Sequence, residues 1–379
     1  MKKILFVATV ENHILYFHIP FIKYFQNKGY EVHVATKLGN MQNELKGISV
    51  ICHNIDFSRS PYSLNNFKAL KQLVNIMKRN KYLLVHVHTP VGAFLGRLAA
   101  KLTNTKPVIY TAHGFHFYKG GPLKNWIIYY TMEKIAAHWT DGIITINKED
   151  FEYAKKFKIR VKNGVYIVHG VGVDIKKYYI NNIKLRKDYR KRYLSATDND
   201  VIIICIGEIN KNKNQMQLIK SIQRILKEKN NVYALIIGDG SERKNLQKYI
   251  KDNELEKNIK ILGFRSDIPE LLNASDIIGL FSYREGLGKC LMEGMAAGLP
   301  IIATDTKGAR ELVNDGYNGF LVPVYDIDKT VDTIKKLADD KELRTKMGSE
   351  GRKIIQDYSI DKVLKEMDEI YSLYLNKTY

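Results

Sequence analysis

Two glutamates in the stretch "REGLGKCLMEGMAAGLP" (284–300) are spaced so that both can reach one ligand. Glu285 follows the apolar run "DIIGLFS", in a turn where Gly286 and Gly288 allow a ligand to approach the backbone closely. A helix is expected to begin near Gly288, and the N–H groups and positive dipole end of its first turn would bind a diphosphate. Glu293 lies about one and a half turns into this helix, at roughly 80° from the direction of Glu285. We therefore predict that Glu285 faces a sugar and that Glu293 faces the hydroxyls of a ribose.

A purely structural interpretation of this pair is the alternative. Glu285 would then cap the helix, and Glu293 would be a solvated helix residue. The neighbours of Glu293, among them Met292, Met295 and Ala296, instead indicate a mostly buried helix. A buried carboxylate is costly unless it has a partner, so we favour a binding role for both glutamates.

The elements that position these residues are short runs rich in Val and Ile, which alternate with longer segments of helical periodicity. Strands that are apolar on both faces and separated by helices predict parallel sheets covered on both sides. The predicted fold class is α/β, with two Rossmann-like, doubly wound parallel-sheet domains facing across a cleft. Ligands bind such sheets outside the carboxyl ends of the strands. The clearest predicted strands are "KILFVAT", "EVHVAT", "LLVHVHT", "PVIYTAH", "GIITIN", "VIIICIG", "VYALIIG", "DIIGLFS" and "PIIATD".

A change in composition marks the boundary between the domains. After "VHGVGVD" (168–174) the chain becomes polar and strongly basic, until "VIIICIGEI" begins a new buried strand. We predict an N-terminal domain over 1–178, a linker over 179–198 and a C-terminal domain over 199–355. The basic run is expected to be a solvated helix. The last segment, 356–379, has apolar residues at helical spacing and is expected to pack back toward the N-terminal domain.

Composition narrows the choice of partner and compartment. The chain of 379 residues carries 60 Lys and Arg against 40 Asp and Glu, a formal net charge of +20. This charge favours an anionic partner, which could be nucleic acid, anionic lipid or a phosphorylated substrate, although a lysine-rich solvated surface explains it as well. The three cysteines lie far apart in apolar runs, which favours a reducing cytoplasm over a disulfide framework or a zinc knuckle. We expect no signal peptide and no membrane span.

A family resemblance becomes specific over residues 282–322. The stretch "SYREGLGKCLMEGMAAGLPIIATDTKGARELVNDGYNGFLV" resembles the E-x7-E signature of retaining glycosyltransferases of family 4. The resemblance implies the GT-B fold, a second domain that binds a nucleotide sugar, and no metal or other cofactor. It also implies that Glu285 contacts hydroxyls of the donor sugar and that Glu293 holds the ribose. The surrounding residues expected to bind the donor are Gly286, Leu287, Gly288 and Lys289.

A phosphate site is expected after the first strand of the C-terminal domain. The segment "IGEINKNKNQ" (206–215) resembles the family's phosphate loop in part. Gly207 begins it, and Lys213 falls where the family has a lysine on the diphosphate. Glu208 stands where the family usually has an arginine, and Lys211 is the nearest replacement; an exposed loop lysine is the alternative for Lys213. Residues expected to line the nucleotide base, chiefly through backbone groups, are Gly238, Gly263, Phe264 and Arg265.

Histidines supply the candidate chemistry of the N-terminal domain. His113 directly follows a predicted strand and matches the family histidine that lies near the donor sugar. It could donate to a sugar hydroxyl or to the departing phosphate oxygen, and near pH 7 either charge state is expected to be available; a packed structural histidine is the alternative. A metal site built from His86, His88, His113 and His116 is also conceivable. We expect no metal, because the set lacks carboxylate and cysteine ligands.

Other N-terminal motifs resemble one subgroup of the family. "NHILYFHIP", "HTPVGAFLGRLAA" and "YTAHGFHFYKG" are similar to enzymes of bacterial capsule, exopolysaccharide and lipid-linked oligosaccharide assembly. The resemblance implies a UDP-sugar donor carrying a hexose or N-acetylhexosamine, and a polyprenyl-diphosphate-linked saccharide acceptor. His13, His18 and His116 are the expected acceptor-binding residues. The helices "FKALKQLVNIMKRNKY" and "KNWIIYYTMEK" would suit a peripheral contact with the inner face of the cell membrane, although ordinary packing explains them as well.

Two competing functions remain at this point. A UDP-sugar epimerase uses the same two-domain architecture and would change the sugar without an acceptor. A basic nucleic-acid binder is indicated by the charge alone, but the chain lacks a recognisable binding module or an interleaved aromatic platform. We therefore expect a glycosyltransferase and no nucleic-acid partner.

Overall fold

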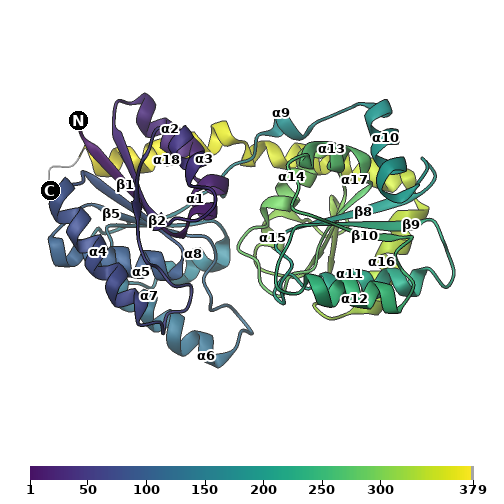
Figure 1. Ribbon diagram of the computed structural model, residues 1–379, viewed down its shortest axis with the longest axis horizontal. Helices are drawn as coiled ribbons and strands as arrows, with labels where there is room; N and C mark the ends of the chain where they lie inside the picture. The colour runs from purple at the N-terminus through teal and green to yellow at the C-terminus, as the bar shows by residue number, and fades with distance from the viewer. Residues whose placement is uncertain (377–379) are drawn as a thin grey trace. The chain divides into compact units, whose positions relative to one another are not determined.

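The computed structural model describes residues 1–376, which form two compact units. The first unit contains Met1–Gly172 and the segment that starts at Ile360, and the second contains Val173–Ser359 (Figure 1). The first unit therefore ends at Gly172 rather than at residue 178. The C-terminal segment that belongs to it begins at Ile360 rather than at residue 356.

Seven parallel strands form the sheet of the first unit, in the order β3-β2-β1-β4-β5-β6-β7. Most of their residues are buried, as strands of Val, Ile and Ala must be when helices cover both faces. From β1 the chain adds β2 and β3 on one side and β4 to β7 on the other, so the direction of strand addition reverses between β1 and β4. The carboxyl ends of these two strands are therefore the expected ligand site. The strands are β1 (Lys3–Val10), β2 (Glu31–Lys37), β3 (Ile51–Asn54), β4 (Leu84–His88), β5 (Val108–Ala112), β6 (Gly142–Thr145) and β7 (Val165–Ile167).

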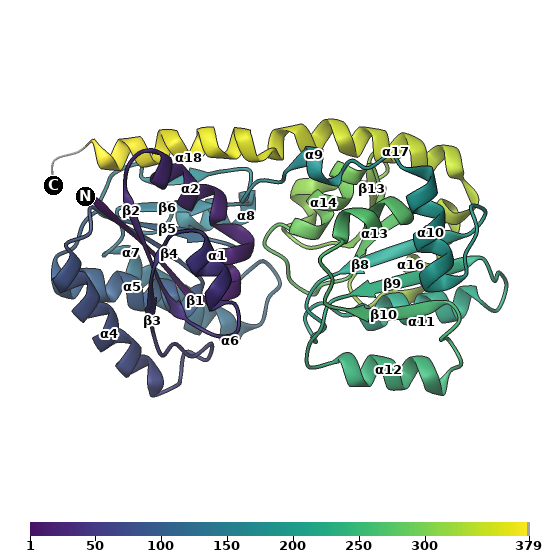
Figure 2. The same cartoon turned by 45° about the horizontal axis from the view of Figure 1, so that its top comes forward.

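Helices cover both faces of this sheet. Apolar side chains of α4 and α5 join Leu5 and Val7 of β1 in one buried cluster. On the opposite face Phe6 of β1 meets Phe25 of α2, whose ring centroid lies 4.7 Å from that of Tyr371 in α18. Helices α2 and α18 lie side by side (Figure 2). The helices are α1 (Glu11–Phe17), α2 (Ile19–Asn27), α3 (Gln42–Gly47), α4 (Asn65–Asn80), α5 (Pro90–Thr103), α6 (Leu123–Asn125), the π-helix η1 (Trp126–Tyr130), α7 (Thr131–Ala137), α8 (Lys148–Ala154) and α18 (Ile360–Leu375).

The last helix is part of the core of the first unit. The Tyr371 hydroxyl forms a 2.9 Å hydrogen bond with Nδ1 of His86 in β4. The Tyr374 hydroxyl donates to the carbonyl of Asp141 at 2.9 Å, at the start of β6. Both tyrosines are buried. The segment furthest along the chain thus satisfies polar groups of strands formed much earlier in it.

Six parallel strands form the sheet of the second unit, in the order β10-β9-β8-β11-β12-β13. The order reverses between β8 and β11, and α11, α12 and α16 pack against one face. The strands are β8 (Val201–Ile206), β9 (Val232–Ile237), β10 (Ile259–Gly263), β11 (Ile277–Leu280), β12 (Ile301–Thr304) and β13 (Gly319–Val322). The helices are α9 (Ile175–Tyr178), α10 (Ile183–Leu194), α11 (Gln215–Ile225), α12 (Arg243–Asp252), α13 (Ile268–Ala274), α14 (Lys289–Ala297), α15 (Ala309–Leu312), α16 (Ile327–Asp339), α17 (Lys341–Ile354) and the 3-10 helix η2 (Ile355–Tyr358).

The basic run expected to be a linker is a packed part of the second unit. Two arginines of α10 form ion pairs with the Asp276 carboxylate. Arg186 Nη2 lies 2.6 Å from its Oδ1, and Arg190 Nη1 lies 2.9 Å from its Oδ2. Arg190 is fully buried and also donates to the Ala274 carbonyl. The predicted helix of this run is present as α10, and most of its lysines are exposed. The run is nevertheless part of the second unit rather than a separate linker over 179–198, because Arg186 and Arg190 pair with Asp276.

Within residues 1–376, no helix is both long enough and apolar enough to cross a lipid bilayer.

Candidate active site

The loops that follow β8 and β11 form the candidate site of the second unit. These strands are neighbours at the point where the strand order reverses, where parallel sheets bind ligands. Two hydrogen bonds join the loops: the Tyr283 N–H donates to the Asn212 carbonyl at 2.8 Å, and Asn212 Nδ2 donates to the Arg284 carbonyl at 3.0 Å. The residues that sequence analysis places on the phosphate and on the sugar are thereby held beside each other.

Lys213 and Glu285 form an ion pair in this site. The Lys213 ammonium lies 2.6 Å from Glu285 Oε2, and the Ser282 hydroxyl donates to the same oxygen at 3.1 Å. Burial works against the charge on Lys213, but the Glu285 carboxylate outweighs it and raises the pKa of the lysine. Lys213 is thus a positively charged, largely enclosed side chain, and the alternative of an exposed loop lysine is wrong.

The predicted glycines lie together at the ends of three adjacent strands. Gly207 follows β8, Gly238 follows β9 and Gly263 ends β10, and the Gly238 N–H donates to the Gly263 carbonyl at 2.8 Å. A Cβ on Gly238 would stand 2.0 Å from the Gly207 carbonyl oxygen, so only glycine lets these loops meet. Of the two residues that follow, Phe264 is 70% exposed and Arg265 binds Asp267 and the hydroxyl of Tyr193 in α10.

The helix predicted near Gly288 begins at Lys289, as α14. Gly288 precedes it with φ of +88°, a left-handed conformation that suits glycine. Gly288 offers no side chain that could cap this helix, and the Glu285 carboxylate is paired with Lys213. The helix dipole places partial positive charge at this end, beside the loop that carries Glu285 and Leu287.

Glu293 is a buried residue of α14 rather than a solvated one. It is 8% exposed, accepts a 2.8 Å hydrogen bond from the Tyr178 hydroxyl and lies 3.9 Å from the Lys289 ammonium. Burial raises the pKa of its carboxyl, against the opposing effects of Lys289 and Tyr178. Glu285 and Glu293 have separate partners, yet both add to the rise that burial causes in the pKa of Cys290, so both carboxylates lie near this thiol.

Tyr178 is the site residue that sequence reasoning missed. It lies in α9, 115 positions before Glu293, and its segment resembles an ordinary basic turn. A buried glutamate requires a hydrogen-bond donor, but the sequence does not show which distant segment supplies it.

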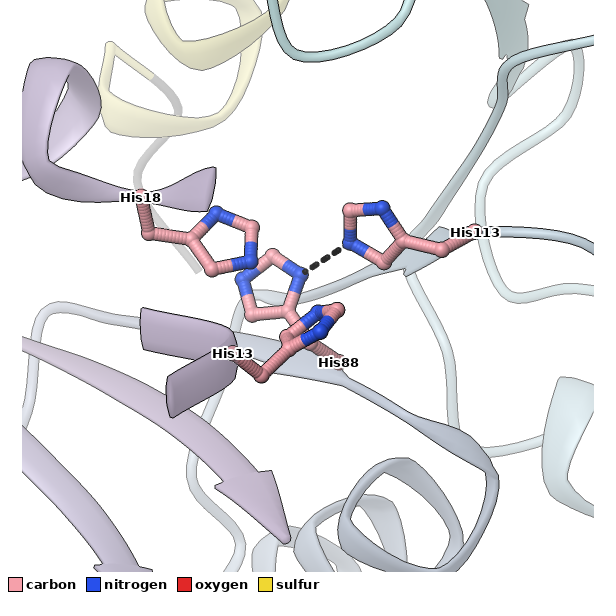
Figure 3. A group of neighbouring side chains, drawn as sticks. All are labelled: His13, His18, His88 and His113. Carbon is pink, nitrogen blue, oxygen red and sulfur yellow. Dashed lines mark hydrogen bonds between the residues drawn. The ribbon is translucent and has the colours of Figure 1, made fainter. Parts of the chain in front are cut away.

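Four histidines form a cluster at the carboxyl ends of the strands in the first unit. His13 comes from α1, His18 from the junction of α1 and α2, His88 from the end of β4 and His113 from the residue after β5. Each offers one ring nitrogen to the cluster, and these four nitrogens lie within 4.8 Å of one another (Figure 3). The predicted residues His13, His18 and His113 are thus brought together, and His88 joins them.

These four imidazoles are uncharged at neutral pH. Burial lowers the pKa of His113 to about 4. Burial, followed by repulsion from neighbouring histidines, lowers the pKa values of His13, His18 and His88 well below their usual range. The expectation that His113 can take either charge state near pH 7 is therefore wrong, because desolvation disfavours its cation.

The other two histidines considered for a metal site lie outside this cluster. The His116 ring packs on Tyr129 of η1, with ring centroids 4.5 Å apart. His86 is held in the core by Thr111 on one ring nitrogen and by Tyr371 on the other. The grouping of His86, His88, His113 and His116 is therefore replaced by a different set, which shares only two of its members.

Two family models match the chain. The model described as "Glycosyl transferases group 1" matches residues 186–354, and "Glycosyl transferase 4-like" matches residues 3–147. The first model covers the site built around Lys213 and Glu285, and the second covers all four clustered histidines.

Curated relatives match along most of their length. A Bacillus subtilis protein named as the glycosyltransferase EpsD is 40% identical over 99% of this chain and 97% of its own. The UDP-Gal:alpha-D-GlcNAc-diphosphoundecaprenol alpha-1,3-galactosyltransferase of Escherichia coli is 30% identical over 87% of this chain and 83% of its own. Among solved structures, Anabaena Alr3699/HepE in complex with UDP-glucose covers 98% of this chain and 100% of its own, with a TM-score of 0.82 and 20% identity. This similarity shows the fold.

Proposed function

The chain belongs to the group 1 and 4-like families of glycosyltransferases, and from that premise we propose that it transfers a hexose or N-acetylhexosamine from a UDP-sugar to a saccharide carried on a polyprenyl diphosphate. The proposal rests on one observation above all. The Lys213–Glu285 ion pair stands at the strand-order reversal of the second sheet, beside the amino end of α14. A cation, an anion and a helix end are thus available for a diphosphate and the sugar attached to it.

The proposed donor contacts follow from the charges of this site. Lys213 and the first turn of α14 bind the diphosphate, since both are positive. Glu285 accepts hydrogen bonds from sugar hydroxyls, and Glu293, held in place by Tyr178, accepts them from the ribose. The loops at Gly207, Gly238 and Gly263 offer backbone groups to the nucleotide. A donor with UDP is supported by the Escherichia coli relative, which is named for UDP-Gal, and by the Anabaena structure with UDP-glucose.

The proposed reaction is a transfer with retention of the anomeric configuration. The bond from the anomeric carbon to the diphosphate oxygen breaks, and a bond to the acceptor oxygen forms on the same face of the sugar. The acceptor hydroxyl loses its proton to the departing phosphate oxygen. Lys213 and the helix end stabilise the negative charge that grows on this diphosphate, a task that otherwise falls to a metal ion. We therefore propose that the transfer itself needs no metal.

The histidines of the first unit have a proposed role as neutral groups. His113 donates a hydrogen bond to a hydroxyl of the donor sugar and orients it, rather than acting as a cationic acid, because burial keeps it uncharged. His13, His18 and His116 remain the proposed contacts of the acceptor.

The proposed acceptor places the enzyme in surface polysaccharide assembly. The Escherichia coli relative is named for a GlcNAc-diphosphoundecaprenol acceptor. The N-terminal motifs resemble enzymes of capsule and exopolysaccharide assembly, and a net charge of +20 suits an anionic lipid carrier. The proposed location is accordingly the cytoplasm, at the inner face of the cell membrane.

Exposed apolar residues of the first unit support contact with this membrane. Leu123 of α6 is 74% exposed and Ile127 of η1 is 61% exposed, one helical turn apart. Lys119 and Lys124 are exposed beside them. Aliphatic side chains flanked by lysines suit the interface of an anionic leaflet.

A transfer assay tests the proposed reaction. The full chain is incubated with UDP- and GDP-sugars, each with and without a GlcNAc-diphosphate-lipid acceptor, in the presence of EDTA. We expect one UDP-sugar to be consumed with formation of a longer lipid-linked saccharide of retained anomeric configuration. Isomerised sugar formed without acceptor would instead identify an epimerase, and a requirement for added Mg²⁺ or Mn²⁺ would contradict the metal-free transfer.

A vesicle assay tests the membrane contact separately. Sedimentation with anionic phospholipid vesicles should recover the wild-type chain, and Leu123→Glu with Ile127→Glu should reduce that recovery. Ile183→Glu is the matched control, since Ile183 is 68% exposed in the second unit and should leave binding unchanged. Equal binding by all three proteins would exclude the proposed surface.

A further inference from the structure

We propose that His13, His18, His88 and His113 form a binding site for a divalent transition-metal ion of the Zn²⁺ type. Four side chains from four separate elements converge there, and one ring nitrogen of each lies within 4.8 Å of the chosen nitrogens of the other three (Figure 3). This site goes beyond the proposed transfer reaction, which uses the metal-free chain. A bound ion would occupy nitrogens that His13, His18 and His113 offer to sugars in that reaction, and so would compete with those contacts.

The ring nitrogens of the cluster lack the partners that buried polar atoms require. Among the described residues, no hydrogen-bond partner is found for Nε2 of His13, for either ring nitrogen of His18 or for Nε2 of His88. His18 is 1% exposed and His88 is fully buried. A buried polar group that has no partner loses its hydrogen bonds to water without replacement, which is unfavourable. A cluster with four such atoms is therefore a site that a ligand would complete.

Contacts within the cluster satisfy only part of this need. Nε2 of His113 lies 3.3 Å from Nδ1 of His88, and the His18 and His88 rings stack with centroids 3.8 Å apart. Stacking leaves the nitrogen lone pairs in the ring planes without a donor. The contrast is His86, two positions from His88 in the same strand, both of whose ring nitrogens are hydrogen-bonded. In β4, His86 thus has a hydrogen-bond partner on each ring nitrogen, whereas Nε2 of His88 is available to a ligand.

The spacing of the nitrogens suits a tetrahedral ion. A Zn–N bond is about 2.0–2.1 Å, which puts the nitrogens of a four-histidine site roughly 3.4 Å apart. Separations of up to 4.8 Å require each ring to move inward by about 1 Å or less. His13 and His113 are partly exposed, which leaves a path for the ion.

The chemistry of the ligands selects the class of ion. The cluster contains neither carboxylate nor thiolate, and imidazole nitrogen suits Zn²⁺, Cu²⁺ and Ni²⁺. Mg²⁺ and Ca²⁺ prefer oxygen ligands and should not bind. An uncharged imidazole is also the form that coordinates a metal.

Cobalt and zinc titrations of the full chain test the site. The protein carries no affinity tag and is stripped with EDTA before Co²⁺ is added. We expect one Co²⁺ per chain with the intense visible absorption of a tetrahedral ion, which Zn²⁺ then displaces and Mg²⁺ does not. Absence of this spectrum would overturn the proposal, and so would a thiolate charge-transfer band, because it would identify cysteine ligands.

Variants locate the ion within the chain. His18→Gln and His88→Gln should each weaken Zn²⁺ binding by more than about 100-fold, beyond the loss expected for an outer-shell partner. His53→Gln and His138→Gln are matched controls, since these histidines lie outside the cluster, and they should bind like the wild type. Circular dichroism checks that each variant folds. Zn²⁺ binding that survives in both cluster variants, or that is lost in His53→Gln, would overturn the assignment, as would binding of inorganic phosphate to the metal-free cluster.

Discussion

The Lys213 ammonium lies 2.6 Å from the Glu285 carboxylate, although the two residues are 72 positions apart in the chain. The topology of the second sheet explains this proximity. Each residue lies in the loop after one of two neighbouring strands, β8 and β11, at the point where the strand order reverses. The pair therefore joins the residue expected on the diphosphate to the residue expected on the sugar.

Lys213→Ala should lower kcat by about 100- to 1000-fold, equivalent to about 3–4 kcal/mol of lost stabilisation of the transition state. The physical reason is that the departing diphosphate loses its nearest cationic side chain. Steady-state kinetics with a defined UDP-sugar measure the loss. Lys227→Ala is the control, because Lys227 is an exposed lysine of the same unit outside the phosphate loop. A loss of the same size in both variants would show a general effect of charge on this unit.

Glu285→Gln should lower turnover much more than it weakens UDP binding. UDP lacks the donor sugar, which is the proposed partner of this carboxylate. Calorimetry with UDP and kinetics with the complete donor separate the two effects. Glu256→Gln, on an exposed side chain of the same unit, should leave both unchanged. Retained turnover in Glu285→Gln would remove this residue from the active site.

Glu293→Ala should weaken UDP binding about 10- to 100-fold, since a hydrogen bond to a charged group contributes about 1.5–3 kcal/mol. Tyr178→Phe removes the hydroxyl that holds Glu293 and should have a smaller effect, about fivefold, because the carboxylate remains. Calorimetry measures both affinities. Tyr62→Phe is the control, on a residue 67% exposed in the first unit. Unchanged affinity in Glu293→Ala would exclude the ribose contact.

Acid should destabilise the first unit in part through His53. Burial, followed by repulsion from His33, lowers the pKa of His53 from 6.5 to about 4. Between these values the unfolded chain binds a proton that the folded chain does not, so stability falls as the pH falls from 6.5 to 4 and is unaffected by this group above 6.5.

The matching experiment compares thermal midpoints of the wild type and His53→Gln at several pH values, with EDTA present. Glutamine keeps an amide that can donate to Nδ1 of His33, which lies 2.9 Å from Nε2 of His53, but it does not titrate. The variant should show a shallower loss below pH 6.5. Parallel pH profiles would mean that His53 makes no contribution.

Sequence reasoning reached the two parallel sheets, the start of α14 and the burial of Glu293, because each depends on local patterns. A run of Val and Ile predicts a buried strand, and Met and Ala around Glu293 predict a buried helix face. The family model and the Bacillus subtilis relative confirm the resemblance that the E-x7-E stretch carried.

The features that sequence reasoning missed depend on contacts between distant segments. Neither the hydroxyl that Tyr178 offers to Glu293 nor the convergence of His88 with His13 and His18 has a local signal. The packing of α10 has no local signal either, because lysine and arginine usually face solvent, whereas Arg190 is buried and pairs with the Asp276 carboxylate. The charge state of His113 depends on its burial, which composition does not reveal.

Helix α18 has a consequence for the biogenesis of this protein. The first unit needs Tyr371 and Tyr374, which leave the ribosome only after every residue of the second unit has been made. Until α18 has been synthesised, Nδ1 of His86 and the Asp141 carbonyl lack the hydrogen bonds that Tyr371 and Tyr374 form with them in the folded protein. The second unit is one uninterrupted stretch and can fold while still tethered to the ribosome. The first unit, although most of it is synthesised first, can therefore complete its fold only after the second unit has been made.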